Sequence, residues 1–199
     1  MALTMTDRVL TEAVGATQGT ALRIKQAAMV LAGIVVLAVS AKISVPMWPV
    51  PITMGTFAVL TLGAAYGPRL GLVTILGYML VGAMGLDVFA GSSAEAYGLT
   101  YMMGGTGGYL VGYVLATVAL GAFARAGYDR SIGGMAIALL VGNALIYVPG
   151  LLWLGQLYGW DKPILAWGLT PFLIGDAVKL ALAALLVPGL WKLIGNARG

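Results

Sequence analysis

Two ionisable residues stand deep inside an apolar stretch near the carboxyl end of the chain. Asp176 and Lys179 lie three residues apart in Pro171-Phe-Leu-Ile-Gly-Asp-Ala-Val-Lys-Leu, so on a helix they share one face. An unpaired charge in hydrocarbon is costly, and such residues usually face a cavity or a partner of opposite charge. The pair therefore predicts a ligand or ion site, with a purely structural ion pair as the alternative.

Two further polar positions fall within or next to apolar stretches. Asn143 and Tyr147 are four residues apart and would form a polar stripe on one helix face. They could serve a ligand or make a single hydrogen bond between helices. Thr53 follows a cluster of prolines, and its hydroxyl could face a cavity or cap the next helix.

Several kinds of chemistry are excluded by what the chain lacks. It contains no cysteine and no histidine, which removes thiolate nucleophiles, Ser-His hydrolases and the usual zinc, haem and iron–sulfur ligands. We predict no second buried acid beside Asp176, as an aspartyl protease would need. The glycine-rich Gly104-Gly-Thr-Gly-Gly-Tyr109 lacks a phosphate-binding lysine, so close helix packing is favoured over nucleotide binding. We expect no catalytic residue, no metal and no cofactor.

The elements that position these residues are helices in a membrane. The chain is 60% hydrophobic and only 9% charged, whereas soluble domains carry about 25% charged residues. Its 30 glycines suit membrane helices, whose backbones approach closely where side chains are small. We therefore predict an all-α integral membrane protein.

Six apolar runs predict six transmembrane helices. Their approximate bounds are 24–44, 52–66, 70–86, 107–126, 132–158 and 164–193. Residues 1–23 are polar and are expected to be flexible or to lie on the surface, so residues 24–193 would form a single transmembrane domain. The stretch 87–105 is the most irregular connection.

The basic residues predict the orientation of this bundle. If the six runs alternate across the membrane, eight bases flank one side and only two the other. Because cytoplasmic loops carry the excess of Lys and Arg, both termini are predicted to be cytoplasmic. The formal charge of +4 reflects this bias, and we expect no nucleic-acid partner. The cytoplasmic set is Arg8, Arg23, Lys25, Arg69, Arg125, Arg130, Lys192 and Arg198, and the outward set is Lys42 and Lys162.

These segments, in this order, resemble the BioY family, the biotin-specific membrane subunits (S components) of energy-coupling-factor (ECF) transporters. The resemblance spans about residues 26–191. It rests on Lys42-Ile-Ser-Val-Pro-Met-Trp-Pro-Val-Pro-Ile-Thr53, Tyr66-Gly-Pro-Arg-Leu-Gly71, Gly82-Ala-Met-Gly-Leu-Asp-Val-Phe-Ala-Gly91 with Gly104–Tyr109, and Gly175-Asp-Ala-Val-Lys179.

The resemblance implies an S-component fold that takes up biotin through a pocket near the outward face. It implies that Asp176 and Lys179 belong to the biotin site, with Lys179 meeting either the valerate or the ureido group. Aromatic walls would then surround the apolar part of biotin. The candidates for these walls are Phe89, Tyr109, Tyr147 and Trp153.

The resemblance also implies partners and a location. An S component works with a transmembrane coupling subunit and two cytoplasmic ATPases in the bacterial plasma membrane. Ala28 and Ala32 form a small-residue face similar to the one that S components use for docking. A homo-oligomer, and a self-sufficient transporter that couples uptake of biotin or another small vitamin to protons through Asp176, are open alternatives.

Three positions depart from the family pattern. Gly55 stands where glutamine is usual, and Asp87 and Gly105 stand where proline is usual. We expect the missing glutamine to remove a polar group near the pocket. The two missing prolines should loosen the loop 87–105.

Overall fold

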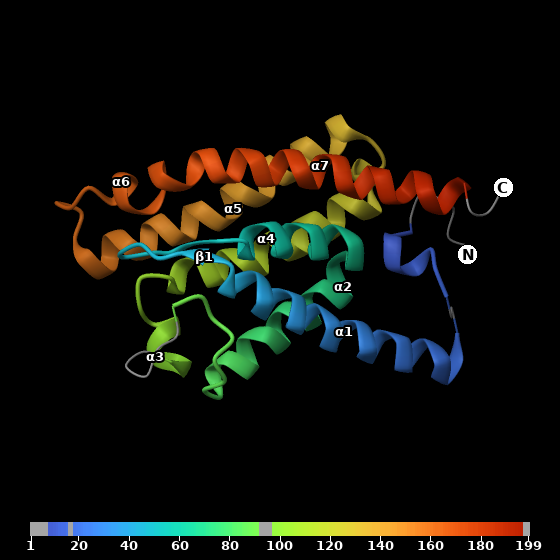
Figure 1. The fold of residues 1–199 in the computed structure, drawn as a ribbon, viewed down its shortest axis with the longest axis horizontal. Helices are drawn as coiled ribbons and strands as arrows, with labels where there is room; N and C mark the ends of the chain where they lie inside the picture. Colours follow the sequence, from blue (N-terminus) through green and yellow to red (C-terminus); the bar gives the residue numbers. More distant parts are fainter. Residues whose placement is uncertain (1–7, 16–17, 92–96, 197–199) are drawn as a thin grey trace.

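The computed structural model describes residues 8–15, 18–91 and 97–196. These residues form an elongated helical bundle with both ends of the chain at one end of the molecule (Figure 1). In chain order its elements are η2 (Leu10–Glu12), α1 (Gly19–Lys42), β1 (Ser44–Val45), β2 (Ile52–Thr53), α2 (Gly55–Ala83), α3 (Gly98–Met102), α4 (Gly107–Arg125), η3 (Tyr128–Arg130), α5 (Ile132–Tyr158), α6 (Ile164–Gly168), η4 (Thr170–Phe172) and α7 (Leu173–Asn196).

The chain is a multi-pass membrane protein with six membrane-crossing segments. Five helical stretches of the described residues are long and apolar enough to cross a bilayer, and one of them, α2, folds back on itself. Gly67 takes φ 75° and ψ 175° ahead of Pro68, and a Cβ on Gly71 would lie 3.8 Å from the Cα of Gly63. Residues eight apart in a continuous helix are about 12 Å apart. The two halves of α2 therefore run back along each other (Figure 1), and the prediction of six segments is confirmed.

Most predicted helices match the structure, but two regions differ. The predicted sixth helix is interrupted, because α6 and η4 precede α7 and Pro171 in η4 has no N–H to donate. The proline-rich loop is closed by a short antiparallel ladder in which Ser44 pairs with Thr53 and Val45 with Ile52. Apart from this two-residue ladder the described residues form helices and their connections, and the all-α fold class is confirmed.

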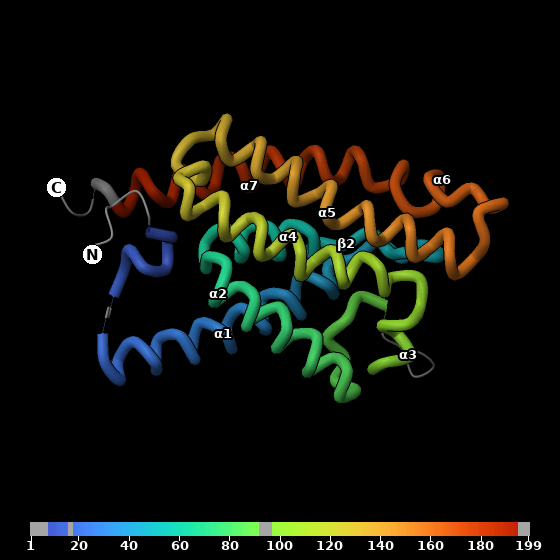
Figure 2. The backbone as a smooth tube through the Cα atoms, turned by 180° about the vertical axis from the view of Figure 1, so that it is seen from behind, coloured from blue at the N-terminus to red at the C-terminus, as the bar shows by residue number. Residues whose placement is uncertain are grey.

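Glycines let the central helices touch backbone to backbone. A Cβ on Gly121 would lie 2.3 Å from the nitrogen of Pro68, and one on Gly112 would lie 2.6 Å from the Cα of Ile146. Real Cβ atoms do not approach so closely, so α4 packs against α2 and α5 only because these positions lack side chains. This core of α2, α4 and α5 is joined by α7 on one side and α1 on the other, as Figure 2 shows from behind.

The described part of the amino-terminal segment is anchored on the bundle. Val9 and Leu10 are buried, Glu12 pairs with Arg125 at 2.5 Å, and Arg130 donates to the carbonyl of Arg8 at 2.7 Å. Residues 8–15 therefore lie against the molecule, while residues 1–7 and 16–17 fall outside the described ranges.

A second buried acid, which we did not predict, lies at this same end. Asp129 accepts a hydrogen bond from the Trp191 ring nitrogen at 2.6 Å and from Arg130 at 3.3 Å. Burial raises the pKa of its carboxyl above the usual range. Asp129 precedes α5, which begins about three helical turns before Asn143, so it cannot form an acid pair with Asp176.

Candidate ligand-binding site

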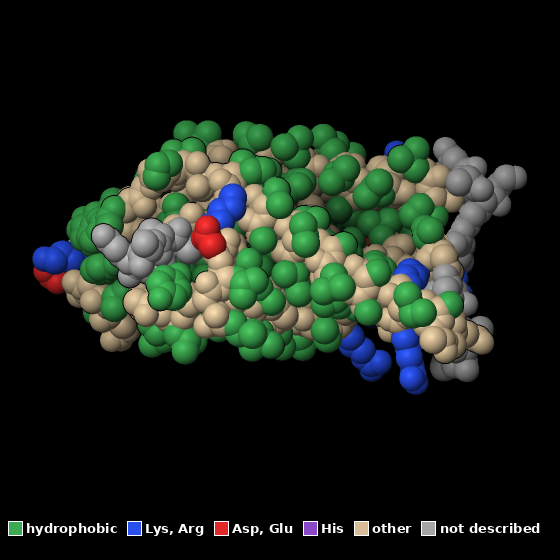
Figure 3. Space-filling view, turned by 60° about the horizontal axis from the view of Figure 1, so that its bottom comes forward, with side chains coloured by type: hydrophobic (Ala, Val, Ile, Leu, Met, Phe, Trp, Pro, Cys, Tyr) green, Lys and Arg blue, Asp and Glu red, His purple; other side chains and the backbone are tan. Residues whose placement is uncertain are grey.

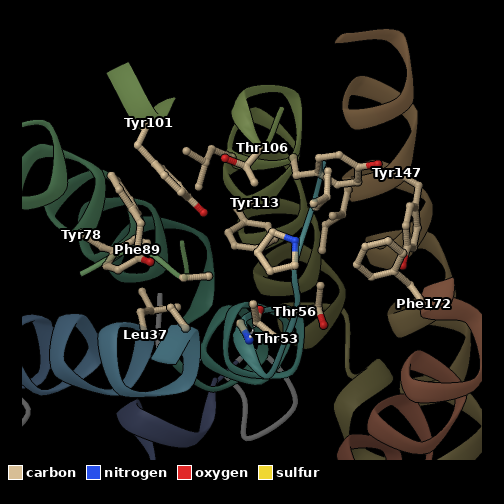
Figure 4. Close-up of a pocket in the computed structure, with 18 of the residues that line it drawn as sticks. Leu37, Thr53, Thr56, Tyr78, Phe89, Tyr101, Thr106, Tyr113, Tyr147 and Phe172 are labelled. Atoms are coloured by element: carbon tan, nitrogen blue, oxygen red, sulfur yellow. Dashed lines mark hydrogen bonds between the residues drawn. The ribbon is translucent and has the colours of Figure 1, made fainter. Parts of the chain in front are cut away.

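A cavity opens where the start of α2 meets α1, α4, α5 and α7 (Figure 4). The space that the centre of a water molecule can occupy is about 60 Å³. Five of the seven predicted site residues line it: Thr53, Phe89, Tyr109, Tyr147 and Lys179. Most of the remaining lining is aromatic or aliphatic, as in many small-molecule sites.

Lys179 supplies the positive charge of this cavity and is almost completely buried. Its Nζ donates to the carbonyl of Thr53 at 2.8 Å, to the hydroxyl of Thr56 at 3.0 Å and to Asp176 at 2.8 Å. An ammonium has three N–H donors, so all of them are used. A ligand that accepts from Lys179 must replace one of the two threonine contacts.

Asp176 lies behind the cavity wall and holds the residues that form it. One carboxylate oxygen accepts from Lys179, and the other accepts from the Tyr147 hydroxyl at 2.5 Å and from the Asn143 amide at 3.3 Å. Neither Asp176 nor Asn143 lines the cavity itself. Both polar stripes predicted from the sequence therefore meet across α5 and α7, and Asp176 positions Lys179 and Tyr147.

Thr53 lines the cavity, as one of the two predictions has it, but it is not the cap of the next helix, because the N-cap residue of α2 is Met54. The Thr53 hydroxyl accepts from the backbone N–H of Gly55 at 2.9 Å, at the first turn of α2. Its carbonyl faces Lys179, and the residue lines the cavity.

Aromatic rings build the walls at the loop side. Phe89 stacks on Tyr101 with ring centroids 5.0 Å apart and meets Tyr78 edge-on at 5.3 Å. A Cβ on Gly82 would lie 2.1 Å from the Phe89 ring, so only glycine admits the ring there. Burial raises the pKa of the Tyr101 hydroxyl, whose oxygen accepts a hydrogen bond from the backbone N–H of Gly91 at 3.4 Å. The prediction for Phe89 as a wall residue agrees with this position.

Tyr109 belongs to the wall, but Trp153 does not. The Tyr109 hydroxyl donates to the carbonyl of Gly168 at 2.8 Å, and its ring meets Tyr147 edge-on at 6.1 Å. Trp153 instead donates to the carbonyl of Gly104 at 2.8 Å and lies against the glycines that open α4. Trp153 was therefore wrong as a wall residue. The contact confirms that the glycine-rich stretch serves helix packing.

Several residues that line the cavity were not predicted from the sequence. For two of them, their spacing from a predicted site residue could have identified them. Tyr113 follows Tyr109 by one helical turn, and Thr56 follows Thr53 by three residues. A Cβ on Gly55 would lie 2.9 Å from the Thr53 hydroxyl and 3.0 Å from the Tyr113 hydroxyl. The absence of a side chain at Gly55 thus leaves space that the Tyr113 hydroxyl approaches. Tyr78, Tyr101, Thr106 and Phe172 also line the cavity (Figure 4).

The loop that carries Phe89 is tied to the end of α1. Lys42 pairs with Asp87 and donates to the carbonyl of Phe89 at 2.7 Å. Gly105 also packs closely, since a Cβ there would lie 3.0 Å from the carbonyl of Pro49. Asp87 therefore makes a contact that ties the loop to α1, and Gly105 fits closely against Pro49. The expected loosening of the loop stays a prediction, and residues 92–96 lie outside the described part.

Comparisons with known proteins agree with this fold. The probable biotin transporter BioY of Pyrococcus horikoshii is 34% identical over 176 residues, covering 88% of this chain and 99% of that protein. The biotin transporter BioY of Thermotoga maritima is 33% identical over 157 residues, covering 79% and 90%. The crystal structure of an S-component for biotin from an ECF-type ABC transporter matches with a TM-score of 0.74 at 22% identity, covering 88% of this chain and 95% of that one. The family model for BioY matches residues 12–196, and the chain therefore belongs to the BioY family.

Proposed function

We propose that this protein captures biotin for uptake, as the substrate-binding membrane subunit of an ECF-type transporter. Relatives named biotin transporters support this assignment, and they place the chain among transporters rather than enzymes. The observation that carries the proposal is the buried network of Asp176 and Lys179 at the wall of an otherwise largely apolar cavity.

The charge of this network favours the ureido ring of biotin over its valerate. Asp176 and Lys179 neutralise each other at 2.8 Å, so a buried carboxylate added beside them would have no cation of its own. The ureido group is neutral and carries two N–H donors and one carbonyl acceptor. Lys179 can donate to that carbonyl, and the threonine oxygen that it releases, of Thr53 or Thr56, can accept a ureido N–H group.

The cavity must widen when biotin enters. A space of about 60 Å³ is well below the roughly 300–1,000 Å³ of ligand pockets. The wall formed by Phe89 and Tyr101 belongs to the segment between α2 and α4, and the Lys42–Asp87 pair that holds it is partly exposed to solvent. We expect this wall to move outward during capture.

Equilibrium binding of labelled biotin to the purified chain tests the proposal. We expect saturable binding of one biotin per chain, which unlabelled biotin displaces. Absence of binding by folded protein would overturn the function.

The geometry does not favour the alternative of proton coupling through Asp176. Both carboxylate oxygens accept hydrogen bonds from Lys179 and Tyr147, and protonation would disrupt this network. Biotin uptake by this chain alone, driven by a pH gradient in liposomes, is the result that would favour the alternative.

The proposed partners are a transmembrane coupling subunit and two cytoplasmic ATPases, in a bacterial plasma membrane with both termini in the cytoplasm. The predicted docking residues Ala28 and Ala32 are exposed on α1, which packs mainly against α2. A flat helix face of this kind suits close contact with another membrane helix.

Substitution of Ala32 by Trp tests this docking face. We expect co-purification with the coupling subunit to fall at least tenfold, because the bulky ring separates the two helices, while biotin binding by the isolated chain is unchanged. Leu31→Trp is the matched control, since Leu31 is already large and is 66% exposed. Equal co-purification of Ala32→Trp and the parent would contradict the assignment.

A further inference from the structure

A second hollow, distinct from the ligand cavity, lies at the end of the molecule that holds the chain termini. It has about 600 Å³ of space between η2, the first turns of α1 and the reversal of α2. We call it the basic groove. Its lining consists of Arg8, Thr11, Glu12, Gln18, Leu22, Lys25, Gln26, Met29, Tyr66, Arg69, Leu70, Val73 and Arg125.

The groove forms where α1 and α2 separate. The two helices are in close contact at Gly33, where a Cβ would lie 2.6 Å from the Thr74 methyl group. The Tyr66 hydroxyl donates to the carbonyl of Met29 at 2.9 Å and fixes the next contact. Beyond this point, toward the amino terminus of α1, the space between the helices opens into the groove.

The groove has an excess of positive charge. Arg8, Lys25, Arg69 and Arg125 line it against one carboxylate, that of Glu12, which pairs with Arg125. Lys25 donates to the carbonyls of Thr11 and Val14, so its charge has no acidic partner there. Within the described ranges Arg69 makes no hydrogen bond or ion pair.

The space-filling view shows the same asymmetry. Lys and Arg side chains gather at the end beside the termini, while the other basic groups visible on this face lie next to acidic ones (Figure 3). Most of the remaining face is apolar, as expected for a surface in contact with lipid.

The opposite part of the groove is apolar. Leu22, Met29, Leu70 and Val73 line it, and Val73 is 55% exposed on the outer side of α2. A ligand that fits must therefore combine an anionic group with a hydrocarbon chain. A free phosphate would leave the apolar half of the groove without a ligand. An acidic peptide would place its own backbone polar groups against that apolar half, where they have no hydrogen-bond partners.

We propose that the basic groove binds an anionic glycerophospholipid, with the phosphate between Lys25 and Arg69 and an acyl chain along Met29 and Val73. Basic pockets between membrane helices on the cytoplasmic side suit such head groups. Arg69 supplies a planar fork of donors for the phosphate oxygens. The site is separate from the cavity that contains Lys179, so lipid binding does not depend on the proposed function.

Native mass spectrometry of the purified full chain tests this site. The protein is titrated with phosphatidylglycerol and, in parallel, with phosphatidylcholine of the same acyl chains. We expect the parent chain to prefer phosphatidylglycerol and Arg69→Gln to lose roughly fivefold of that preference, equivalent to about 1 kcal/mol for one basic residue. Arg23→Gln is the matched control, because Arg23 is exposed on α1 and does not line the groove.

Four other results would count against the proposal. Equal binding of the two lipids by the parent chain would overturn it. An equal loss in Arg23→Gln and Arg69→Gln would show a general charge effect rather than a site. Displacement of the bound lipid by glycerophosphoglycerol, the same head group without acyl chains, would contradict the role of the apolar half. Loss of the coupling subunit from Arg69→Gln with intact lipid preference would assign the groove to a protein.

Discussion

Substitution of Asp176 by Ala is expected to weaken biotin binding by about a hundredfold or more. The change leaves the Lys179 ammonium buried without its anion and removes the acceptor of the Tyr147 hydroxyl. Truncation of one partner of a buried, hydrogen-bonded charge pair in a binding site costs about 2–5 kcal/mol of binding free energy, and each 1.4 kcal/mol is tenfold in affinity. Equilibrium binding of labelled biotin at neutral pH measures the effect.

Two further variants separate loss of the site from loss of the fold. Asp161→Ala removes an acid whose side chain is 72% exposed and paired with Lys162, and we expect unchanged biotin affinity. In Asp176→Ala/Lys179→Met no charge remains unpaired, so thermal stability should return toward that of the parent while biotin binding stays weak. If the Asp176→Ala variant binds biotin with the affinity of the parent, the network around Asp176 does not belong to the biotin site.

Substitution of Gly112 by Val is expected to prevent stable folding. The new Cβ would lie 2.6 Å from the Cα of Ile146 and 2.7 Å from its carbonyl oxygen, so α4 and α5 must separate. Overpacking typically costs about 1–3 kcal/mol and occasionally more. The upper end is expected here, because the new atoms meet backbone and the contact between these helices is central to the bundle. Thermal unfolding in detergent, followed by size exclusion, measures the loss.

Gly189→Val is the control for this prediction. Gly189 also lies within a helix, α7, but a Cβ there meets nothing within 4 Å. We expect its unfolding temperature to stay within a few degrees of the parent. Similar destabilisation by both substitutions would indicate that the cost is one of helix propensity and not of close packing.

The sequence predicted the polar centre of the site because lipid makes buried charge conspicuous. Asp176 and Lys179 stood out in an apolar stretch, and Asn143 and Tyr147 shared a helix face. All four meet in one hydrogen-bonded network. Their depth relative to the cavity was not predictable, since it depends on how α5 and α7 are rotated against each other. Asp176 therefore supports the wall without lining it.

The aromatic walls were harder to predict for a related reason. An aromatic residue in an apolar helix is equally acceptable facing lipid, a neighbouring helix or a cavity. Tyr113 and Tyr78 were missed, and Trp153 was placed in the wall although it anchors Gly104. Only long-range packing separates these cases.

Glycine and proline positions in the sequence predicted the number of helices and some of the helix ends. Gly67 and Pro68 marked the reversal within α2, which the positive φ of Gly67 confirms. The interruption between α6 and α7 was missed, because residues 164–193 form one apolar run and were predicted to be a single helix. Pro171 was the available signal there, since a proline removes a helical hydrogen bond.

The structure of the protein with biotin bound tests the central claim most directly. We predict biotin in the cavity between Phe89 and Tyr147, with its ureido carbonyl about 3 Å from the Lys179 nitrogen and its valerate directed away from Asp176. Biotin bound outside this cavity, or bound inside it with the valerate against Lys179, would contradict the account.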